Sequence, residues 1–188
     1  MKMAFIIFER MTALDFIGIY DPLTRLKSMD FIPNLDWDIC AFTEDVKDDK
    51  GLNFTPTVVG GSLQQYDLIV IPGGFGTRAL WKDTAFIQWL QTSNPSSLKV
   101  SVCTGSILLG AAGFLKGKRA TTHPNSFDEL KPFCLSVVDE RIVDERDVIT
   151  ARGVTSGIDA GLYLVEKLAG APVRIKIAQQ MDYPYYQR

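Results

Sequence analysis

KVSVCTGSILLGAA, residues 99–112, places a short strand, a four-residue turn and an apolar helix in direct succession. Lys99 to Val102 has the length and valine content of a buried strand, whereas Ile107 to Ala112 has the composition of a buried helix that Gly113 ends. Strand-to-helix units of this kind, when repeated, build a parallel sheet covered by helices on both faces. The stretch therefore predicts an α/β fold.

The rest of the chain repeats this alternation. Strands are expected at residues 4–8, 37–42 and 67–71, helices at 14–29, from Asp83, at 158–168 and at 172–181, a short hairpin before Val59, and a β pair formed by 137–143 and 148–151. Thr12 is expected to cap the first helix, and Pro22 to kink it or shift its start. Because no linker or repeat interrupts the pattern, we predict one domain, residues 1–188, with a mostly parallel central sheet between two helix layers.

The composition is that of a globular protein without a nucleic-acid or membrane surface. Hydrophobic residues make up 46% of the chain and charged residues 22%, and a net charge of -2 offers no basic footprint. No run approaches the roughly 18 apolar residues of a membrane span, and the apolar run 4–8 lacks a signal cleavage site, which indicates a cytoplasmic protein. The three cysteines form no metal or disulfide pattern; Cys40, in an apolar run, is expected in the core, and Cys134 is expected to be inert.

Cys103 stands at the turn between strand and helix, which suits a nucleophile. Side chains there project at the carboxyl edge of the sheet, where open α/β sheets place their sites. The N–H groups at the start of the following helix favour a thiolate, so we expect a lowered Cys103 pKa. The alternative is that Cys103 is simply a small buried residue, as free cysteines often are.

A second turn favours the reactive interpretation. IPGGFG, residues 71–76, also follows a strand, and Gly73 and Gly74 allow backbone amides to converge. We expect the N–H groups of Gly74 and Thr104 to form an oxyanion hole beside Cys103. Many Gly-Gly turns only connect elements, so the pair alone does not define a site.

These motifs together resemble the ThiJ/PfpI superfamily. LDFIG (14–18), IPGGFG (71–76) and VCTGS (102–106) are similar to it in the same order, and ATTH (120–123) and GVTSGID (153–159) extend the likeness over nearly the whole chain. The resemblance implies a flavodoxin-like three-layer sandwich, a homodimer and a small electrophilic substrate, without a cofactor or a metal. The motifs are specific to the superfamily rather than to one activity.

The resemblance also implies an acid partner for the cysteine. Family members place a carboxylic acid from the first helix against it, and Asp15 stands at that position. A carboxyl beside a thiolate should stay protonated, because two adjacent negative charges raise its pKa, and it could then act as a general acid. On the residues alone, Asp15 could instead be a helix N-terminal aspartate that favours the helix dipole.

Three activities remain open. The family proteases carry His directly after the cysteine, and Thr104 in that place disfavours peptidase activity. Asp15, Cys103 and Thr104 most resemble the isocyanide hydratases, in which the thiolate attacks the isocyanide carbon, the acid protonates that centre and water releases a formamide. Thr104 would orient the sulfur or the water through its hydroxyl and contribute its amide.

A glyoxalase or deglycase acting on 2-oxoaldehydes is the second possibility. That branch offers a His about twenty residues after the cysteine, and His123, the only histidine, fills this place, although the branch typically has Glu where Asp15 stands. His123 could equally be a surface loop residue. Gly153, Val154 and Thr155 are expected to form the opposite wall of the site.

The third possibility is a non-catalytic redox or ligand sensor. The motif at residues 14–18 also occurs in amidase-like domains of AraC-type regulators, which carry a C-terminal helix-turn-helix domain, and we expect too few residues after the last helix for one here. A reactive thiolate is readily oxidised, so sensing and catalysis share this pattern. The aromatic end, residues 183–188, is expected to pack on the domain or to form a dimer contact.

Overall fold

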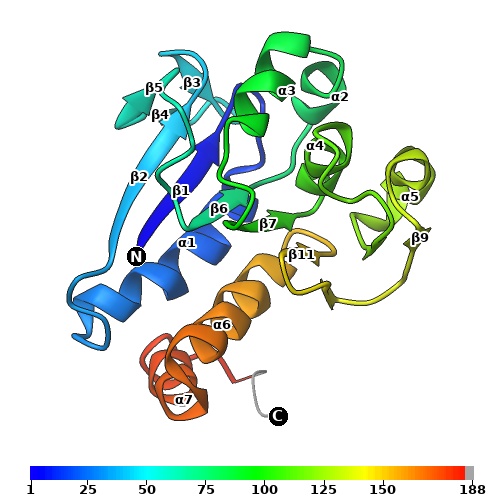
Figure 1. Ribbon diagram of the computed structural model, residues 1–188. Coiled ribbons are helices and arrows are strands. Elements are labelled where there is room, and N and C mark those ends of the chain that lie inside the picture. The colour runs from blue at the N-terminus through cyan, green and yellow to red at the C-terminus, as the bar shows by residue number, and fades with distance from the viewer. Residues whose placement is uncertain (185–188) are drawn as a thin grey trace.

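A seven-stranded sheet forms the middle layer of the protein (Figure 1). In the computed structural model, which describes residues 1–184, the strand order is β10-β11-β7-β6-β1-β2-β5, and every neighbouring pair is parallel except β10–β11. The strands are β1 (Lys2–Ile7), β2 (Asp36–Ala41), β5 (Val58–Val59), β6 (Leu68–Ile71), β7 (Leu98–Val102), β10 (Ile142–Asp144) and β11 (Val148–Ala151). The predicted α/β sandwich with a mostly parallel sheet is confirmed.

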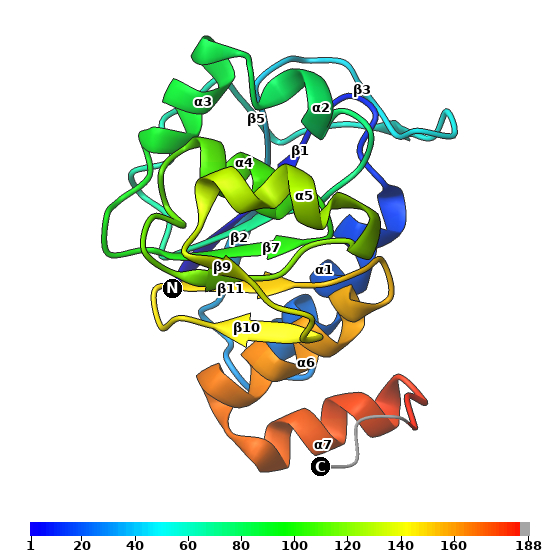
Figure 2. The same ribbon diagram turned by 90° about the vertical axis from the view of Figure 1, so that its right-hand side faces the viewer.

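Helices cover both faces of this sheet (Figures 1 and 2). One face carries α1 (Ala13–Ser28) and α6 (Ser156–Ala169), with α7 (Ala171–Gln180) packed outside them. The other face carries α3 (Thr84–Gln91) and α4 (Gly105–Ala111), with the short helices α2 (Thr77–Leu80) and α5 (Phe127–Leu130) nearby. Two single-turn 3₁₀ helices, η1 (Pro124–Ser126) and η2 (Lys131–Phe133), flank α5.

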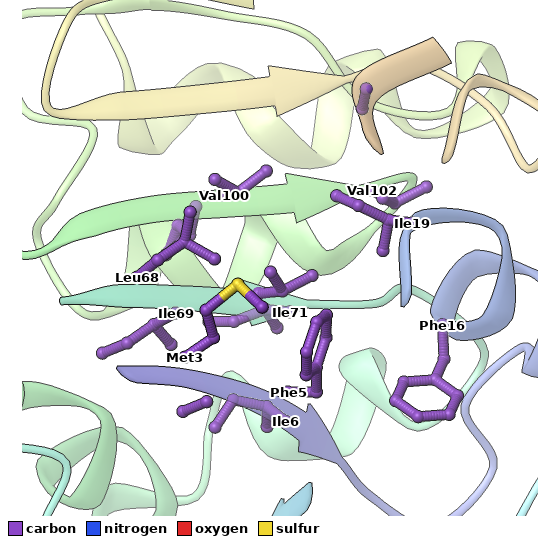
Figure 3. Packing of buried hydrophobic residues seen from close by; sticks show 14 of the residues in the cluster. Met3, Phe5, Ile6, Phe16, Ile19, Leu68, Ile69, Ile71, Val100 and Val102 are labelled. Atoms are coloured by element: carbon purple, nitrogen blue, oxygen red, sulfur yellow. The ribbon is translucent and has the colours of Figure 1, made fainter. Parts of the chain in front are cut away.

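The core lies on both sides of the central strands. Figure 3 shows Met3, Phe5 and Ile6 of β1 near Ile69 and Ile71 of β6, and each of these side chains is buried. Strands covered by helices on both faces have no solvent side, so their sequences are continuous apolar runs rather than alternating ones. This is why these strands could be predicted from short hydrophobic stretches.

Helix α1 continues through its proline. The expectation that Pro22 would shift the start of the helix is wrong, because α1 begins at Ala13 and includes Pro22. The proline packs against α6 at Gly161, where an added Cβ would lie 2.3 Å from the Pro22 ring. Thr12 occupies the N-cap position as expected, but its side chain makes no capping hydrogen bond.

One predicted β pair is only partly correct. β10 and β11 pair antiparallel, but the first residues of the predicted segment 137–143 leave the sheet: β9 (Ser136–Val137) pairs with β8 (Arg119–Ala120) instead. The charged residues between β9 and β10 form ion pairs instead: Asp139 with Arg152, Glu140 with Arg119, and Arg141 with Asp159. The predicted hairpin is confirmed as β3 (Val46–Lys47) and β4 (Asn53–Phe54).

The end of the described chain packs on α6. Tyr183 contacts the core cluster and donates from its hydroxyl to the Asp159 carboxylate at 2.9 Å, which agrees with the expected packing role. Residues 185–188 of the predicted aromatic end lie outside the described residues. Within residues 1–184, no helix has the length and apolar content to cross a bilayer.

Candidate active site

Three neighbouring parallel strands, β1, β6 and β7, end at one edge of the sheet, and the candidate site lies there. Asp15 is in the first turn of α1, which follows β1; Gly73 and Gly74 follow β6; and Cys103 follows β7. The strand order reverses between β1 and β6, and the crevice at such a reversal is the usual binding position in open α/β sheets. The topology therefore brings residues from distant parts of the chain to one place.

Cys103 has a left-handed backbone, with φ at +56°. A non-glycine residue rarely adopts this conformation, which costs of order 1–3 kcal/mol and needs support from its surroundings. The support is visible in three hydrogen bonds: the Cys103 N–H donates to the Ala151 carbonyl at 2.9 Å, and the Cys103 carbonyl accepts from Thr122 Oγ1 at 3.0 Å and Ser106 Oγ at 3.1 Å. The predicted sharp turn at the nucleophile is therefore present and well held.

Gly73 lies at the centre of the site. A Cβ at Gly73 would be 2.5 Å from the Thr104 nitrogen and 2.8 Å from both Asp15 Oδ2 and the Cys103 Cβ. These distances show that Asp15, Cys103 and Thr104 surround the same point, as the sequence predicted. They also explain the glycine, because any side chain there would separate the carboxyl from the cysteine.

The Asp15 carboxyl is completely buried. Its Oδ2 accepts from the Gly73 N–H at 3.0 Å, whereas no N–H or O–H donor among the described residues reaches Oδ1. Burial raises the pKa of Asp15 from its ordinary value of 3.8 to about 6, although hydrogen bonds with Cys103 and Gly73 oppose the shift. Cys103 is therefore the neighbouring side chain that acts on this carboxyl.

The prediction of a lowered Cys103 pKa is wrong. The side chain is only 6% exposed, and burial, followed by the charge of Asp15, raises its pKa to about 12. The amide and hydroxyl of Thr104 act in the opposite direction but do not compensate for the lost hydration. Burial therefore shifts both groups toward their protonated forms, and the sulfur lacks the thiolate character that its place at a helix start was expected to give.

The expected oxyanion hole is not formed by Gly74. Its N–H donates to Thr104 Oγ1 at 3.0 Å, and the neighbouring Gly73 N–H donates to Asp15. Thr104 Oγ1 also lies 3.2 Å from Thr77 Oγ1, which in turn donates to the Gly74 carbonyl at 2.8 Å. The hydroxyl of Thr104 thus fixes the Gly74 turn, while its amide is directed to the Cys103 sulfur.

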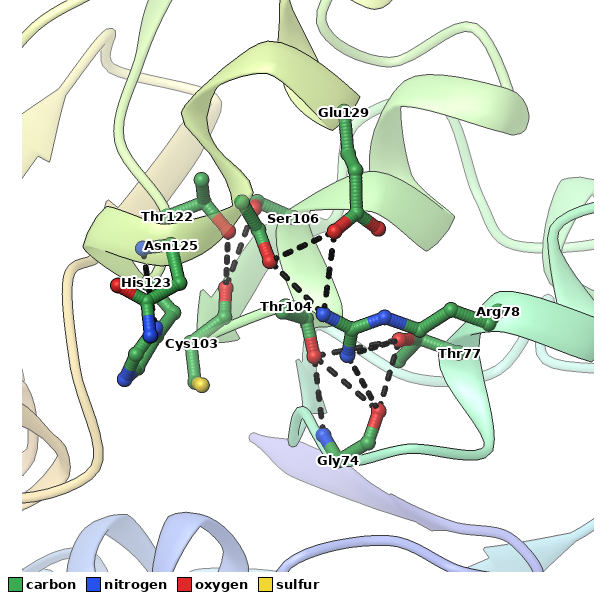
Figure 4. A network of polar contacts seen from close by, with 11 residues as sticks. Gly74, Thr77, Arg78, Cys103, Thr104, Ser106, Thr122, His123, Asn125 and Glu129 are labelled. Carbon is green, nitrogen blue, oxygen red and sulfur yellow. Dashed lines mark hydrogen bonds and ion pairs between the residues drawn. The ribbon is translucent and has the colours of Figure 1, made fainter.

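His123 lies in the segment that holds the Cys103 carbonyl (Figure 4). Its neighbour Thr122 makes that hydrogen bond, and the His123 ring is half-buried, with Nδ1 accepting from the Asn125 N–H at 3.3 Å. The Cδ2 atom lies 3.9 Å from the position of a Cβ on Gly153. The structure therefore brings His123 and Gly153 together near the nucleophile.

The rest of the expected wall is more open. Gly153 and Val154 are half-buried and Thr155 is exposed, and the Gly153 carbonyl accepts from the Ser156 N–H at 2.8 Å where α6 begins. The Thr155 hydroxyl accepts from Arg141 at 3.3 Å. Thr155 is therefore engaged with an arginine at the surface, and a role in lining the site stays a prediction for Val154.

Several contacts around the nucleophile have no counterpart in the sequence analysis. The polar side chains that it did not identify are Thr77, Arg78, Ser106, Thr122 and Ser126. Thr122 belonged to a recognised motif, but its contact with a carbonyl 19 residues earlier depends on the tertiary structure. No sequence signal marked Arg78.

The two remaining cysteines belong to other segments. Cys40 is fully buried in β2, as predicted, and burial raises its pKa to about 11. Cys134 is half-buried and donates to the Leu130 carbonyl at 3.6 Å. Among residues 1–184, no group of three or more His, Cys, Asp or Glu side chains is arranged to hold a metal ion.

Comparison with known families agrees with this geometry over most of the chain. The DJ-1/PfpI family matches residues 1–167. The chain belongs to the DJ-1/PfpI family. The family assignment confirms the resemblance to the ThiJ/PfpI superfamily.

Relatives in this family differ in activity. Isonitrile hydratase of Pseudomonas putida is 34% identical over 185 residues, which is 97% of this chain and 78% of the relative. Glutathione-independent glyoxalase DJR-1.2 of Caenorhabditis elegans is 30% identical over 131 residues, 68% of this chain and 70% of the relative. A ThiJ/PfpI family protein from Pseudomonas syringae has a similar solved structure, with a TM-score of 0.88, 29% identity and coverage of 99% of this chain and 76% of that one.

Proposed function

We propose that this protein is an isocyanide (isonitrile) hydratase, which adds water to an isocyanide to give an N-substituted formamide. The observation that carries the proposal is the buried Asp15 carboxyl beside the buried Cys103 side chain, both of which surround Gly73. The reaction needs a sulfur nucleophile and a group that removes and then returns one proton. Asp15 is suited to both transfers.

The reaction proceeds in two halves. The Sγ–H proton passes to the Asp15 carboxylate as sulfur bonds to the terminal carbon of R–N≡C, and that carbon then takes the proton from Asp15, which leaves a thioimidate, R–N=CH–S–Cys103. Water adds to the thioimidate carbon, the nitrogen gains a proton and the C–S bond breaks. R–NH–CHO leaves and the Cys103 thiol is restored, so the net change is the addition of one water.

The occupied amides of the glycine turn favour this reaction over attack on a carbonyl. Addition of sulfur to an aldehyde or an amide creates an oxyanion, which needs free donors such as paired backbone N–H groups. Here the Gly73 and Gly74 amides donate to Asp15 and Thr104. Addition to an isocyanide instead places negative charge on carbon, and a proton from Asp15 neutralises it.

The similarity to the hydratase of P. putida over 97% of this chain supports the same assignment. We therefore extend the proposal to a small electrophilic substrate, a homodimer and a cytoplasmic location. The glyoxalase alternative has support in the placement of His123 beside Gly153 and in the C. elegans relative. The sensor alternative uses the same thiol without turnover.

Purified protein is offered para-nitrophenyl isocyanide and, separately, methylglyoxal, and products are quantified by liquid chromatography. We expect formamide from the isocyanide and its loss in Cys103→Ala, by on the order of 1,000-fold or more, because the covalent step is removed. Cys40→Ala is the matched control, since it removes a buried thiol in β2. It should retain activity.

Two results would reject the hydratase proposal. Lactate formed from methylglyoxal, without formamide from the isocyanide, would assign the protein to the glyoxalases. If neither product forms, and mild peroxide adds oxygen to Cys103 in wild-type protein but not in Cys103→Ala, the thiol is a sensor.

A further inference from the structure

Arg78 is not used in the chemistry proposed above, yet its guanidinium connects two segments of the site (Figure 4). Nη1 donates to the Gly74 carbonyl at 3.3 Å, and Nη2 donates to Ser126 Oγ at 2.8 Å. Gly74 and Ser126 are both buried and come from separate loops, one after β6 and one before α5. These two contacts fix one side of the site against the other.

Each of the two partners of Arg78 is linked to Cys103 by a path of contacts, called an arm below. The first arm runs from Gly74 to Cys103. The Gly74 N–H donates to Thr104 Oγ1 at 3.0 Å, and Thr104 directly follows Cys103. The Thr104 hydroxyl donates to the Gly74 carbonyl at 3.3 Å, and the Thr104 amide opposes the rise in the pKa of the Cys103 thiol. A displacement of Gly74 therefore reaches the sulfur through Thr104.

The second arm runs from Ser126 to the same residue by another route. The Ser126 N–H donates to the His123 carbonyl at 2.8 Å, and Thr122 Oγ1 donates to the Cys103 carbonyl at 3.0 Å. Both hydroxyl-bearing residues are buried. The segment from 122 to 126 is thus held at one end by Cys103 and at the other by Arg78.

The two arms and Arg78 form a closed hydrogen-bond ring through Gly74, Thr104, Cys103, the segment 122–126 and Arg78. The simpler interpretation is that Arg78 only forms a surface ion pair with Glu129, at 3.2 Å and with both side chains about two-fifths exposed. Such pairs contribute little to stability. The ion-pair interpretation does not explain why the same guanidinium also donates to buried partners in two separate segments. A planar group with several N–H donors suits arginine rather than lysine.

We propose that Arg78 is a positioning residue that closes this ring and so keeps the Thr104 amide in place beside the Cys103 sulfur. The inference rests on the proposed role of Cys103 as a nucleophile, but not on the identity of the electrophile. Without Arg78, the Gly74 turn and Thr104 relax, and the thiolate loses part of its hydrogen bonding.

The test is the rate at which iodoacetamide alkylates Cys103 between about pH 6 and pH 9, followed by peptide mass spectrometry. Arg78→Met should slow alkylation about three- to tenfold at each pH, because a rise of half to one unit in the thiol pKa lowers the thiolate fraction by that factor. Arg78→Lys should restore part of the rate. Ser126→Ala, which opens the ring at another bond, should also slow alkylation.

Glu129→Gln is the matched control, because it removes the charge of the ion pair while the glutamine carbonyl can still accept from Ser126 Oγ, which donates to Glu129 at 3.1 Å. It should alkylate at the wild-type rate. The double variant Arg78→Met/Thr122→Val should be less impaired than the product of its single variants, since both changes open one ring. Circular dichroism and the unfolding temperature verify folding, and Ser126→Ala carries the test if Arg78→Met does not fold.

The proposal is wrong if the folded variants, Arg78→Met or Ser126→Ala, alkylate at the wild-type rate, or if the double variant shows multiplicative effects. It is also wrong if Glu129→Gln slows alkylation as much as Arg78→Met does. Absence of formamide production together with the expected alkylation rates would reject the hydratase function and leave the role of Arg78 in place.

Discussion

Lys99 and Cys103 stand near opposite ends of strand β7, and both are buried groups that can ionise. At the amino end, the Lys99 ammonium donates to the carbonyls of Asn94, Pro95 and Ser97 at 2.7, 3.2 and 2.9 Å. Burial lowers its pKa, but all three of its hydrogens have acceptors. The Lys99 ammonium therefore has a hydrogen-bond partner for each of its hydrogens.

The carboxyl end is arranged differently. Cys103 has a left-handed backbone, its thiol and the Asp15 carboxyl both have raised pKa values, and Asp15 Oδ1 is buried without an N–H or O–H donor among the described residues. The amino end of β7 therefore stabilises the protein through Lys99. The carboxyl end retains the strained backbone of Cys103 and the poorly compensated Asp15 carboxyl. The comparison indicates that reactivity at Cys103 is maintained with a loss of stability that the rest of the sheet offsets.

The comparison is tested most strongly by Asp15→Asn. Asparagine keeps the shape and can still accept from the Gly73 N–H, but it cannot carry the proton between sulfur and substrate carbon. We expect the rate of formamide production to fall by about 100- to 10,000-fold, measured as kcat/KM on para-nitrophenyl isocyanide. Asp45→Asn, an exposed aspartate far along the chain, is the control. Activity within tenfold of wild type would exclude Asp15 from proton transfer.

Asp15→Asn should lower activity but raise the free energy of unfolding near neutral pH. Because the folded-state pKa of Asp15 is about 6 against an ordinary 3.8, the native state binds this proton more tightly, and its stabilising effect is lost as pH rises from about 4 to 6. Above that range the buried carboxylate costs about 3 kcal/mol. Urea unfolding should therefore find Asp15→Asn more stable than wild type at about pH 7 but not at about pH 4. Equal differences at both pH values would contradict this account.

Lys99→Met tests the amino end of β7. Methionine fills a similar volume but removes three hydrogen bonds, so we expect the free energy of unfolding to fall by about 2 kcal/mol, while the kcat of the folded enzyme changes less than twofold. Lys116→Met, at an exposed lysine, should alter neither quantity. A large loss of activity without a loss of stability would show that the two ends of β7 are not separate in function.

The sequence predicted those helices and strands that are long enough to show a continuous or periodic pattern of apolar residues. The central strands and the helices α1, α3, α6 and α7 were identified, because burial on two faces or on one helical face leaves a continuous or repeating apolar signal. Strand β5 and helices α2 and α5 have two to four residues each and have no such period. They form because neighbouring elements hold them.

The site was predictable in its members but not in its electrostatics. The strand-to-helix turn at Cys103 and the family resemblance together predicted that Asp15, Gly73 and Cys103 lie close together. The structure places them around one point. The direction of the Gly74 amide depends on its φ of +131° and on the Thr104 side chain, neither of which the sequence encodes locally. The thiol pKa depends on the depth of burial, a property of the whole fold.

His123→Ala is expected to have the smallest effect. In the proposed hydratase, Asp15 performs the proton transfers, and His123 is a half-buried neighbour whose Nδ1 is engaged by the Asn125 N–H at 3.3 Å. We therefore expect kcat on para-nitrophenyl isocyanide to change by less than about threefold, since no step passes through the imidazole. KM should rise slightly, because the ring and Gly153 form one side of the space beside Cys103.

The same variant also discriminates between the reactions. In a glyoxalase, a proton must move between the carbons of the 2-oxoaldehyde, and loss of a histidine base would lower the rate about 100-fold or more. Circular dichroism and the unfolding temperature of His123→Ala are the control for a general loss of folding. A loss of isocyanide hydration above tenfold in the folded variant would show that proton transfer is shared with His123 and that Asp15 alone does not complete the site.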